Sequence, residues 1–130
     1  MKKGQSLVEL AISFVVLLLL LGGAVEFGMA FFQFVQLRDA AQEGALYGSY
    51  CQDFTQIESR TRGASDSPVD LSSSDVSVLI ESDGIEGGDL KVTLIYNHAV
   101  FMPFISIFVG NTIPLRAEVT DTILKVDCSP

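Results

Sequence analysis

The residues best placed to do chemistry lie at the N-terminal end, where Gly4 precedes Glu9 by five positions. An uncharged apolar run follows Glu9, and a carboxylate in a membrane costs about 2.5 to 3.5 kcal/mol at full depth and less near the surface. Such a group needs a cation. Cleavage after Gly4 would supply one as the α-amine of Gln5, so the spacing predicts a peptidase site and an amine–carboxylate pair, the closer amine coming from a neighbouring subunit.

No other group of residues predicts catalysis or metal binding. His98 is the single histidine, and we expect it to be structural. The serines lack a G-x-S-x-G elbow, and the acidic stretch 81–89 lacks the ligand pattern of an EF-hand loop. Cys51 and Cys128 have no second ligand at zinc spacing. We therefore predict no enzymatic activity, no metal and no cofactor.

The charge balance argues against a nucleic-acid partner. The chain has 16 acidic and 8 basic residues and a net charge of −8, so it would be repelled by a phosphate backbone. Two of the basic residues, Lys2 and Lys3, lie at the N-terminus. We expect the acidity of the remainder to be a solubilising surface, with an acidic binding face as the alternative.

The apolar run predicts a single membrane span. Residues 7–25 approach the length of about 20 residues that a helix needs to cross a bilayer, with Glu9 as the only charge. Lys2 and Lys3 then place the N-terminus in the cytoplasm and the rest of the chain outside. A cleaved secretory signal is the alternative, although no clear A-x-A cleavage site follows the run.

Three sequence blocks resemble the TadE-like pseudopilins of the tight-adherence (Tad/Flp) branch of type IV pilus systems. They read G-Q-S-L-V-E-L-A from residue 4, G-G-A-V-E-F-G from residue 22 and D-A-A-Q-E-G-A-L-Y from residue 39. The resemblance is strong over residues 4–48 and weak in the last two strand-like segments. Residues 51–90 do not match the family pattern.

The resemblance implies a pilin-like subunit, inserted in the inner membrane and trimmed by a prepilin peptidase between Gly4 and Gln5. Such a subunit assembles into, or initiates, a pilus for adhesion or surface attachment, with other pilin subunits and the assembly machinery as partners. Glu9 and Glu26 would then act in subunit assembly, although Glu26 could instead face the membrane interface. The rival hypothesis is a membrane-anchored extracytoplasmic binding protein that does not polymerise.

These residues must be positioned by a long helix, because no proline occurs before Pro68. A helix over residues 5–50 would be about 69 Å long, and small residues four apart predict close helix packing at Ala24 with Gly28 and at Gly44 with Gly48. We expect an α+β, pilin-like fold. Its parts are a leader (1–4), a transmembrane segment (5–34), an extracytoplasmic continuation of the helix (35–50) and a small β-rich domain (51–130).

The β-rich domain is predicted from alternating apolar residues. Residues 76–80 and 90–96 indicate a hairpin and residues 113–126 a last strand, whereas residues 51–75 have the composition of an irregular loop. The apolar stretch 99–110 predicts a buried loop, a short helix or a partner surface. In an exported domain Cys51 and Cys128 are expected to form a disulfide, with two buried thiols as the alternative.

Overall fold

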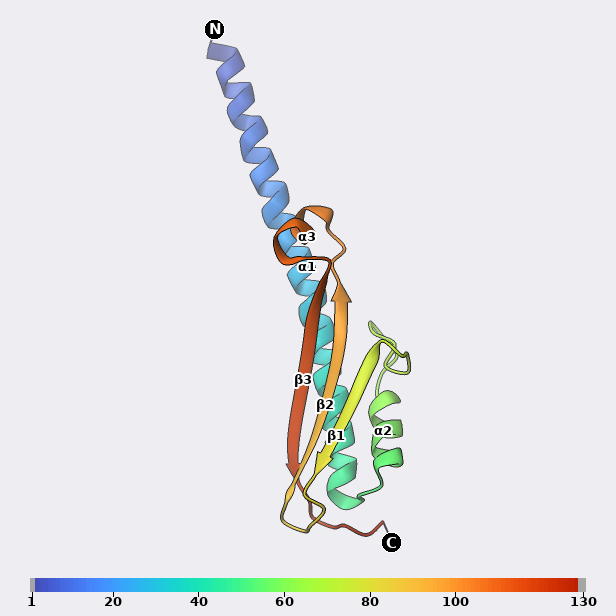
Figure 1. Ribbon diagram of the computed structural model, residues 1–130. Coiled ribbons are helices and arrows are strands. Elements are labelled where there is room, and N and C mark those ends of the chain that lie inside the picture. Colours follow the sequence, from blue (N-terminus) through green and yellow to red (C-terminus); the bar gives the residue numbers. More distant parts are fainter. Residues whose placement is uncertain (1, 129–130) are drawn as a thin grey trace.

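A computed structural model describes residues 2–128 of the chain, with side chains described from Gly4 onward. Helix α1 (Lys2–Tyr50) runs unbroken for 49 residues, which corresponds to about 74 Å. Figure 1 shows its N-terminal part standing alone and its C-terminal part covered by the other elements. The topology prediction based on Lys2 and Lys3 concerns side chains that lie outside this description.

Three antiparallel strands form one sheet in the order β1-β2-β3. They are β1 (Val76–Ser82), β2 (Asp89–Ala99) and β3 (Thr112–Thr122). The predicted α+β fold, with a long apolar helix before a small antiparallel sheet, is therefore confirmed. The hairpin is also confirmed, since Val76 pairs with Tyr96 and Ser82 with Leu90, but β3 ends at Thr122, four residues before the predicted end of the last strand.

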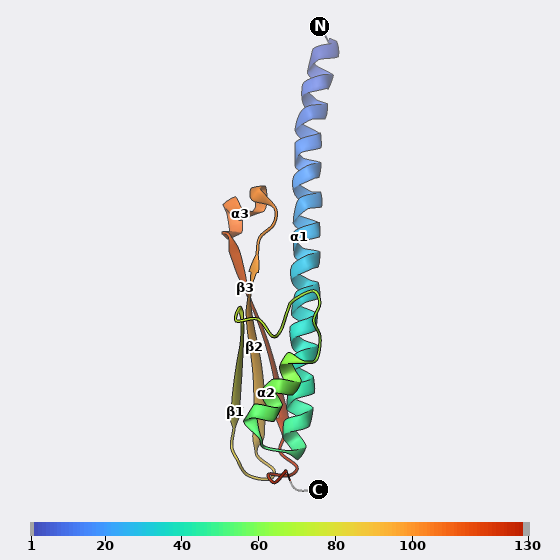
Figure 2. The same cartoon turned by 90° about the vertical axis from the view of Figure 1, so that its right-hand side faces the viewer.

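The core lies between the sheet and the C-terminal half of α1 (Figure 2). Small residues on the helix let the sheet approach closely, and apolar side chains from β2 and β3 fill the space. The fully or nearly fully buried residues of this contact include Leu37, Ala40, Ala41, Ala45, Leu90, Val92, Leu94 and Ala117. Burial of this surface fixes the sheet on one side of the helix.

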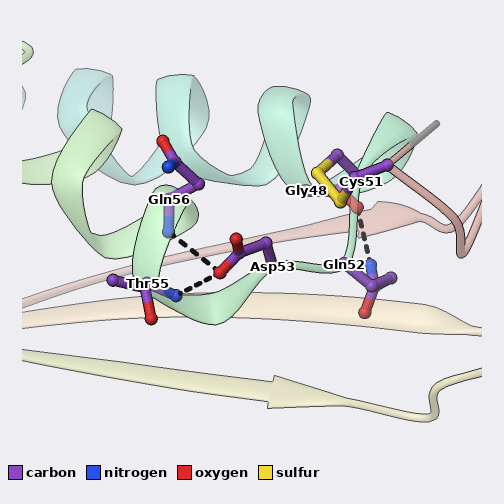
Figure 3. The surroundings of a disulfide bond; sticks show 7 residues. Gly48, Cys51, Gln52, Asp53, Thr55 and Gln56 are labelled. Carbon is purple, nitrogen blue, oxygen red and sulfur yellow. Dashed lines mark hydrogen bonds between the residues drawn. A yellow bond between two sulfur atoms is a disulfide. The ribbon is translucent and has the colours of Figure 1, made fainter. Parts of the chain in front are cut away.

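A second helix, α2 (Phe54–Arg62), occupies part of the segment that the sequence predicted to be irregular. The prediction of a loop was wrong for these residues because their polar composition does not show two features that stabilise the helix. Asp53 caps the helix by accepting hydrogen bonds from the backbone N–H groups of Thr55 and Gln56 (Figure 3). Ile57 and Thr61, one turn apart, are buried against α1, so tertiary packing holds this short polar helix.

The apolar stretch between β2 and β3 contains the short helix α3 (Pro103–Val109). One of the three predicted alternatives for this stretch is therefore observed. The helix lies at the end of the sheet from which the free part of α1 extends, as both views show. The opposite end of the sheet holds the β1–β2 turn and the C-terminal segment.

Candidate membrane and assembly site

The free part of α1 is an apolar helix without a protein partner. An 18-residue window near its N-terminus has a mean hydropathy of 2.5, and none of that window is buried. Every side chain from Gly4 to Leu21 is exposed, including a run from Val15 to Leu21 of large aliphatic residues. A helix of this length and composition can cross a bilayer, and its exposure shows that it is not the core helix of this fold.

The residues of the predicted cleavage site lie at the start of this helix. Gly4 and Gln5 are exposed, and Glu9 lies one turn after Gln5 on the same face of α1. Among the residues whose side chains are described, none forms a hydrogen bond or an ion pair with the Glu9 carboxylate. Cleavage after Gly4 and pairing of Glu9 with a freed amine both remain predictions.

Glu26 lies where α1 leaves the sheet domain, and its carboxylate is almost completely buried, with a residue exposure of 2%. Its Oε1 atom is 2.8 Å from His98 Nε2 and accepts a 3.0 Å hydrogen bond from the backbone N–H of Phe101. Its Oε2 atom accepts a 3.0 Å hydrogen bond from the backbone N–H of Met102. The other ring nitrogen of His98 lies 2.6 Å from Gln33 Oε1.

This arrangement gives Glu26 partners within its own subunit. Oε1 takes two of these contacts and Oε2 one, and the side chain is buried, so little of the carboxylate surface is left for a neighbouring subunit. From the sequence we expected Glu26 to act in subunit assembly or to face the membrane interface, and Gln33 was not predicted to take part. His98 was expected to be structural, but its partner was not predicted. One signal in the sequence could have indicated this contact. His98 is the single histidine and precedes an uncharged segment, and Glu26 is the single acid near the outer end of the apolar helix.

Comparison with known proteins identifies a family for the N-terminal part of the chain. Residues 4–46 match a family described as TadE-like protein. The chain has a TadE-like N-terminal segment. The family resemblance is therefore confirmed over residues that include the predicted cleavage site, Glu9 and Glu26. No curated protein and no solved structure matches the chain significantly.

The two small-residue pairs of α1 have different surroundings. Ala24 is exposed, and a Cβ atom on Gly28 would contact nothing within 4 Å. A Cβ on Gly44 would overlap the side chain of Thr61 in α2. Gly48 is also close to other elements, because a Cβ there would overlap side chains of α2 and β2. The second pair thus packs within the subunit, whereas the first faces outward.

A disulfide between Cys51 and Cys128 joins the end of α1 to the segment after β3, as predicted for an exported domain (Figure 3). Backbone hydrogen bonds reinforce this connection. Ser49 O, near the C-terminal end of the helix, accepts from the N–H groups of Leu124 and Lys125 at 2.8 and 3.0 Å. The carbonyl groups that a helix leaves unpaired at its C-terminus are thereby partly satisfied.

Proposed function

We propose that the protein is a pilin-like subunit of a Tad/Flp-type pilus, inserted in the inner membrane and trimmed after Gly4 by a prepilin peptidase. The N-terminus would face the cytoplasm and the sheet domain the extracytoplasmic side. The observation that carries the proposal is the exposed apolar part of α1, which lies inside the TadE-like match and begins with the Gly4–Gln5 sequence. Its role is assembly, in a minor subunit or an initiating one, for adhesion or surface attachment.

The dimensions of α1 suit two successive environments. The free part of the helix is long enough for the hydrocarbon core of a bilayer, about 30 Å thick. In a filament the same apolar surface would be covered by the equivalent helices of other subunits. The proposed parts of the chain are a leader (1–4), a transmembrane segment (5–34), a helical continuation (35–50) and an extracytoplasmic domain (51–130).

Glu9 supplies the assembly chemistry of the proposal. After cleavage, the α-amine of Gln5 has a reference pKa near 8 and is largely charged at neutral pH. An amine from a neighbouring subunit, shifted along the filament axis, would neutralise the Glu9 carboxylate in an apolar environment. Because such a pair is directional, it would set the register between subunits as well as attract them.

Glu26 has a different part in the proposal from the one that the sequence suggested. Its hydrogen bonds run to β2 and to the segment before α3 in the same subunit. It would therefore hold the sheet domain in a fixed position relative to the membrane span. Subunit contacts near this level would use the outward-facing surface around Ala24 and Gly28.

The rival is an anchored extracytoplasmic protein that never polymerises, and fractionation separates the two functions. Cells that produce the protein together with a Tad system are sheared, and the subunit is measured in the membranes and in the sheared surface material. A pilin-like subunit is expected in both fractions. Confinement to the membranes, with other pilins present in the sheared material, would support the rival.

A further inference from the structure

The segment between β2 and β3 is an exposed apolar surface. We use the name apolar tip for residues 100–110, which include no charged side chain. Its most exposed large residues are Phe108 (79%), Phe101 (77%), Ile107 (77%) and Phe104 (63%). Proteins in water rarely expose several large apolar side chains in one patch, so this surface needs an apolar partner.

The position of the apolar tip along α1 identifies that partner. Met102 and Ile105 pack over Gly22 and Gly23 of the helix. If the hydrocarbon region begins near Leu7, Gly22 lies about 23 Å into it, about 7 Å short of the far boundary of a 30 Å core. The tip is thus at the depth at which interfacial helices insert their apolar faces, about 5 to 10 Å into the boundary.

We infer that the apolar tip is a second membrane contact, immersed beside α1 in the leaflet on the side of the sheet domain, with lipid acyl chains as its partner. The inference rests on the proposed membrane span of α1 and is independent of cleavage and assembly. The apolar surface is continuous with the helix. A groove between the tip and α1 is lined only by apolar residues, among them Leu18, Gly22, Met102 and Phe104.

The hydrogen bonds of the tip provide an independent observation. Non-helical backbone at membrane depth is tolerated only where its polar groups are satisfied by protein. The N–H groups of Phe101 and Met102 donate to the two oxygens of Glu26. The N–H groups of Val100 and Gly110 donate to the carbonyls of Asn111 and Ser106 at 2.9 Å each. The entry and exit of the tip therefore satisfy these donors without water, as immersion requires.

Exposed phenylalanines on α1 extend the same surface at the level of the tip. Phe27 and Phe31 stack with their ring centroids 6.1 Å apart, and both are more than half exposed. The single acid at this level, Glu26, is buried beneath the tip. Phe27 and Phe31 line one groove with Ile105 and Val109 of the tip. A continuous apolar surface of this kind favours lipid over an aqueous or charged protein surface.

The sequence contains no tryptophan, so a single introduced Trp reports its own surroundings. Three full-length variants would be reconstituted separately in phosphatidylcholine vesicles: Phe108→Trp in the apolar tip, Phe14→Trp in the span and Ile85→Trp in the exposed β1–β2 turn. Ile85 is the matched aqueous control, because it is 64% exposed and lies at the other end of the sheet. Phe101→Trp gives a second reporter in the tip.

Immersion predicts emission at shorter wavelength for Phe108→Trp and Phe101→Trp than for Ile85→Trp, with loss of emission in lipids brominated near the top of the acyl chain. Acrylamide should quench Ile85→Trp far more strongly. Quenching of the tip variants by acrylamide and not by brominated lipid, with Phe14→Trp quenched by the lipid, would overturn the inference alone. If brominated lipid does not quench the emission of Phe14→Trp, both the membrane span and the inference are overturned. The tip variants could also emit at short wavelength without being quenched by brominated lipid, and their emission could shift to longer wavelength when the protein is diluted. That result would assign the surface to a second copy and overturn the lipid contact.

Discussion

Glu26 Oε1 and His98 Nε2 meet at 2.8 Å although the two residues are 72 positions apart in the chain. The contact joins the TadE-like segment to the sheet domain, which lies outside the family match. Because both side chains are buried where the free helix begins, they fix how the sheet domain sits on α1. The apolar tip owes its position to the same carboxylate.

Replacing Glu26 should therefore destabilise the packing of β2 and the apolar tip against α1. Glu26→Leu leaves His98 Nε2 and two backbone N–H groups without their acceptor, and each buried donor left unsatisfied costs about 1 to 3 kcal/mol. Glu26→Gln keeps one acceptor oxygen and should cost less. Urea unfolding in detergent measures the change, with Glu43→Leu, an exposed acid of the same helix, as the control. Equal stability of Glu26→Leu and Glu43→Leu would contradict the role of the contact.

The glycines of α1 should respond oppositely to an added methyl group. Gly44→Ala must displace the Thr61 side chain, and overpacking of this kind typically costs about 1 to 3 kcal/mol. Gly28→Ala meets nothing and should be neutral or stabilising by up to about 1 kcal/mol, the difference in helix propensity. Thermal unfolding of the two variants in the same detergent compares them. A Gly28→Ala loss as large as that of Gly44→Ala would show that the outward face is also packed in the isolated subunit.

The disulfide should contribute strongly to the stability of the extracytoplasmic domain. Cys51 and Cys128 are 77 positions apart, so closing the loop would stabilise the fold by about 4 kcal/mol in the chain-entropy model. The double variant Cys51→Ser with Cys128→Ser should unfold at a lower denaturant concentration, and reductant should lower the midpoint of the wild type alone. Intact mass after alkylation should find no free thiol in unreduced exported protein. Two alkylated cysteines there would exclude the bond in the cell.

Glu9 should be needed for assembly and dispensable for insertion. Glu9→Leu removes a charge from the span, so the variant is expected in the membrane at wild-type amounts or above, and absent from the sheared surface material. Glu9→Gln keeps the shape without the charge and should be partly defective. Glu43→Leu is the matched control outside the membrane segment. Wild-type amounts of Glu9→Leu in the sheared fraction would exclude the pairing mechanism.

The sequence was sufficient where a pattern is local and failed where partners are distant. The long helix follows from the absence of proline, and the hairpin from the alternation around Val76 and Leu90, so both could be predicted. The Cys51–Cys128 bond followed from the expectation of export. Helix α2 was missed for two reasons. Its Asp53 cap is a local signal that was not read, and the burial of Ile57 against α1 is a distant contact that composition does not reveal.

The residues of the candidate site show the same difference between local and distant signals. Gly4, Gln5 and Glu9 are related by spacing along one segment, so the sequence alone is enough to propose them, and their roles stay predictions. The surroundings of Glu26 depend on a β-strand folding back 72 positions later, and nothing local indicates it. Gln36 is a similar case, because it holds the α2–β1 connection by paired 2.8 Å hydrogen bonds with the backbone N–H and carbonyl of Val69.

The mature N-terminus tests the central claim most directly. The protein is purified from membranes of cells that contain the prepilin peptidase, and its N-terminal peptide is sequenced by tandem mass spectrometry, with Gly4→Leu measured in parallel. The account predicts that the wild-type chain begins at Gln5 and that Gly4→Leu, whose bulky side chain does not fit a site accepting glycine, keeps its first four residues. A wild-type chain that still carries residues 1–4, in cells where the peptidase trims a known substrate, would contradict the assignment as a pilin-like subunit.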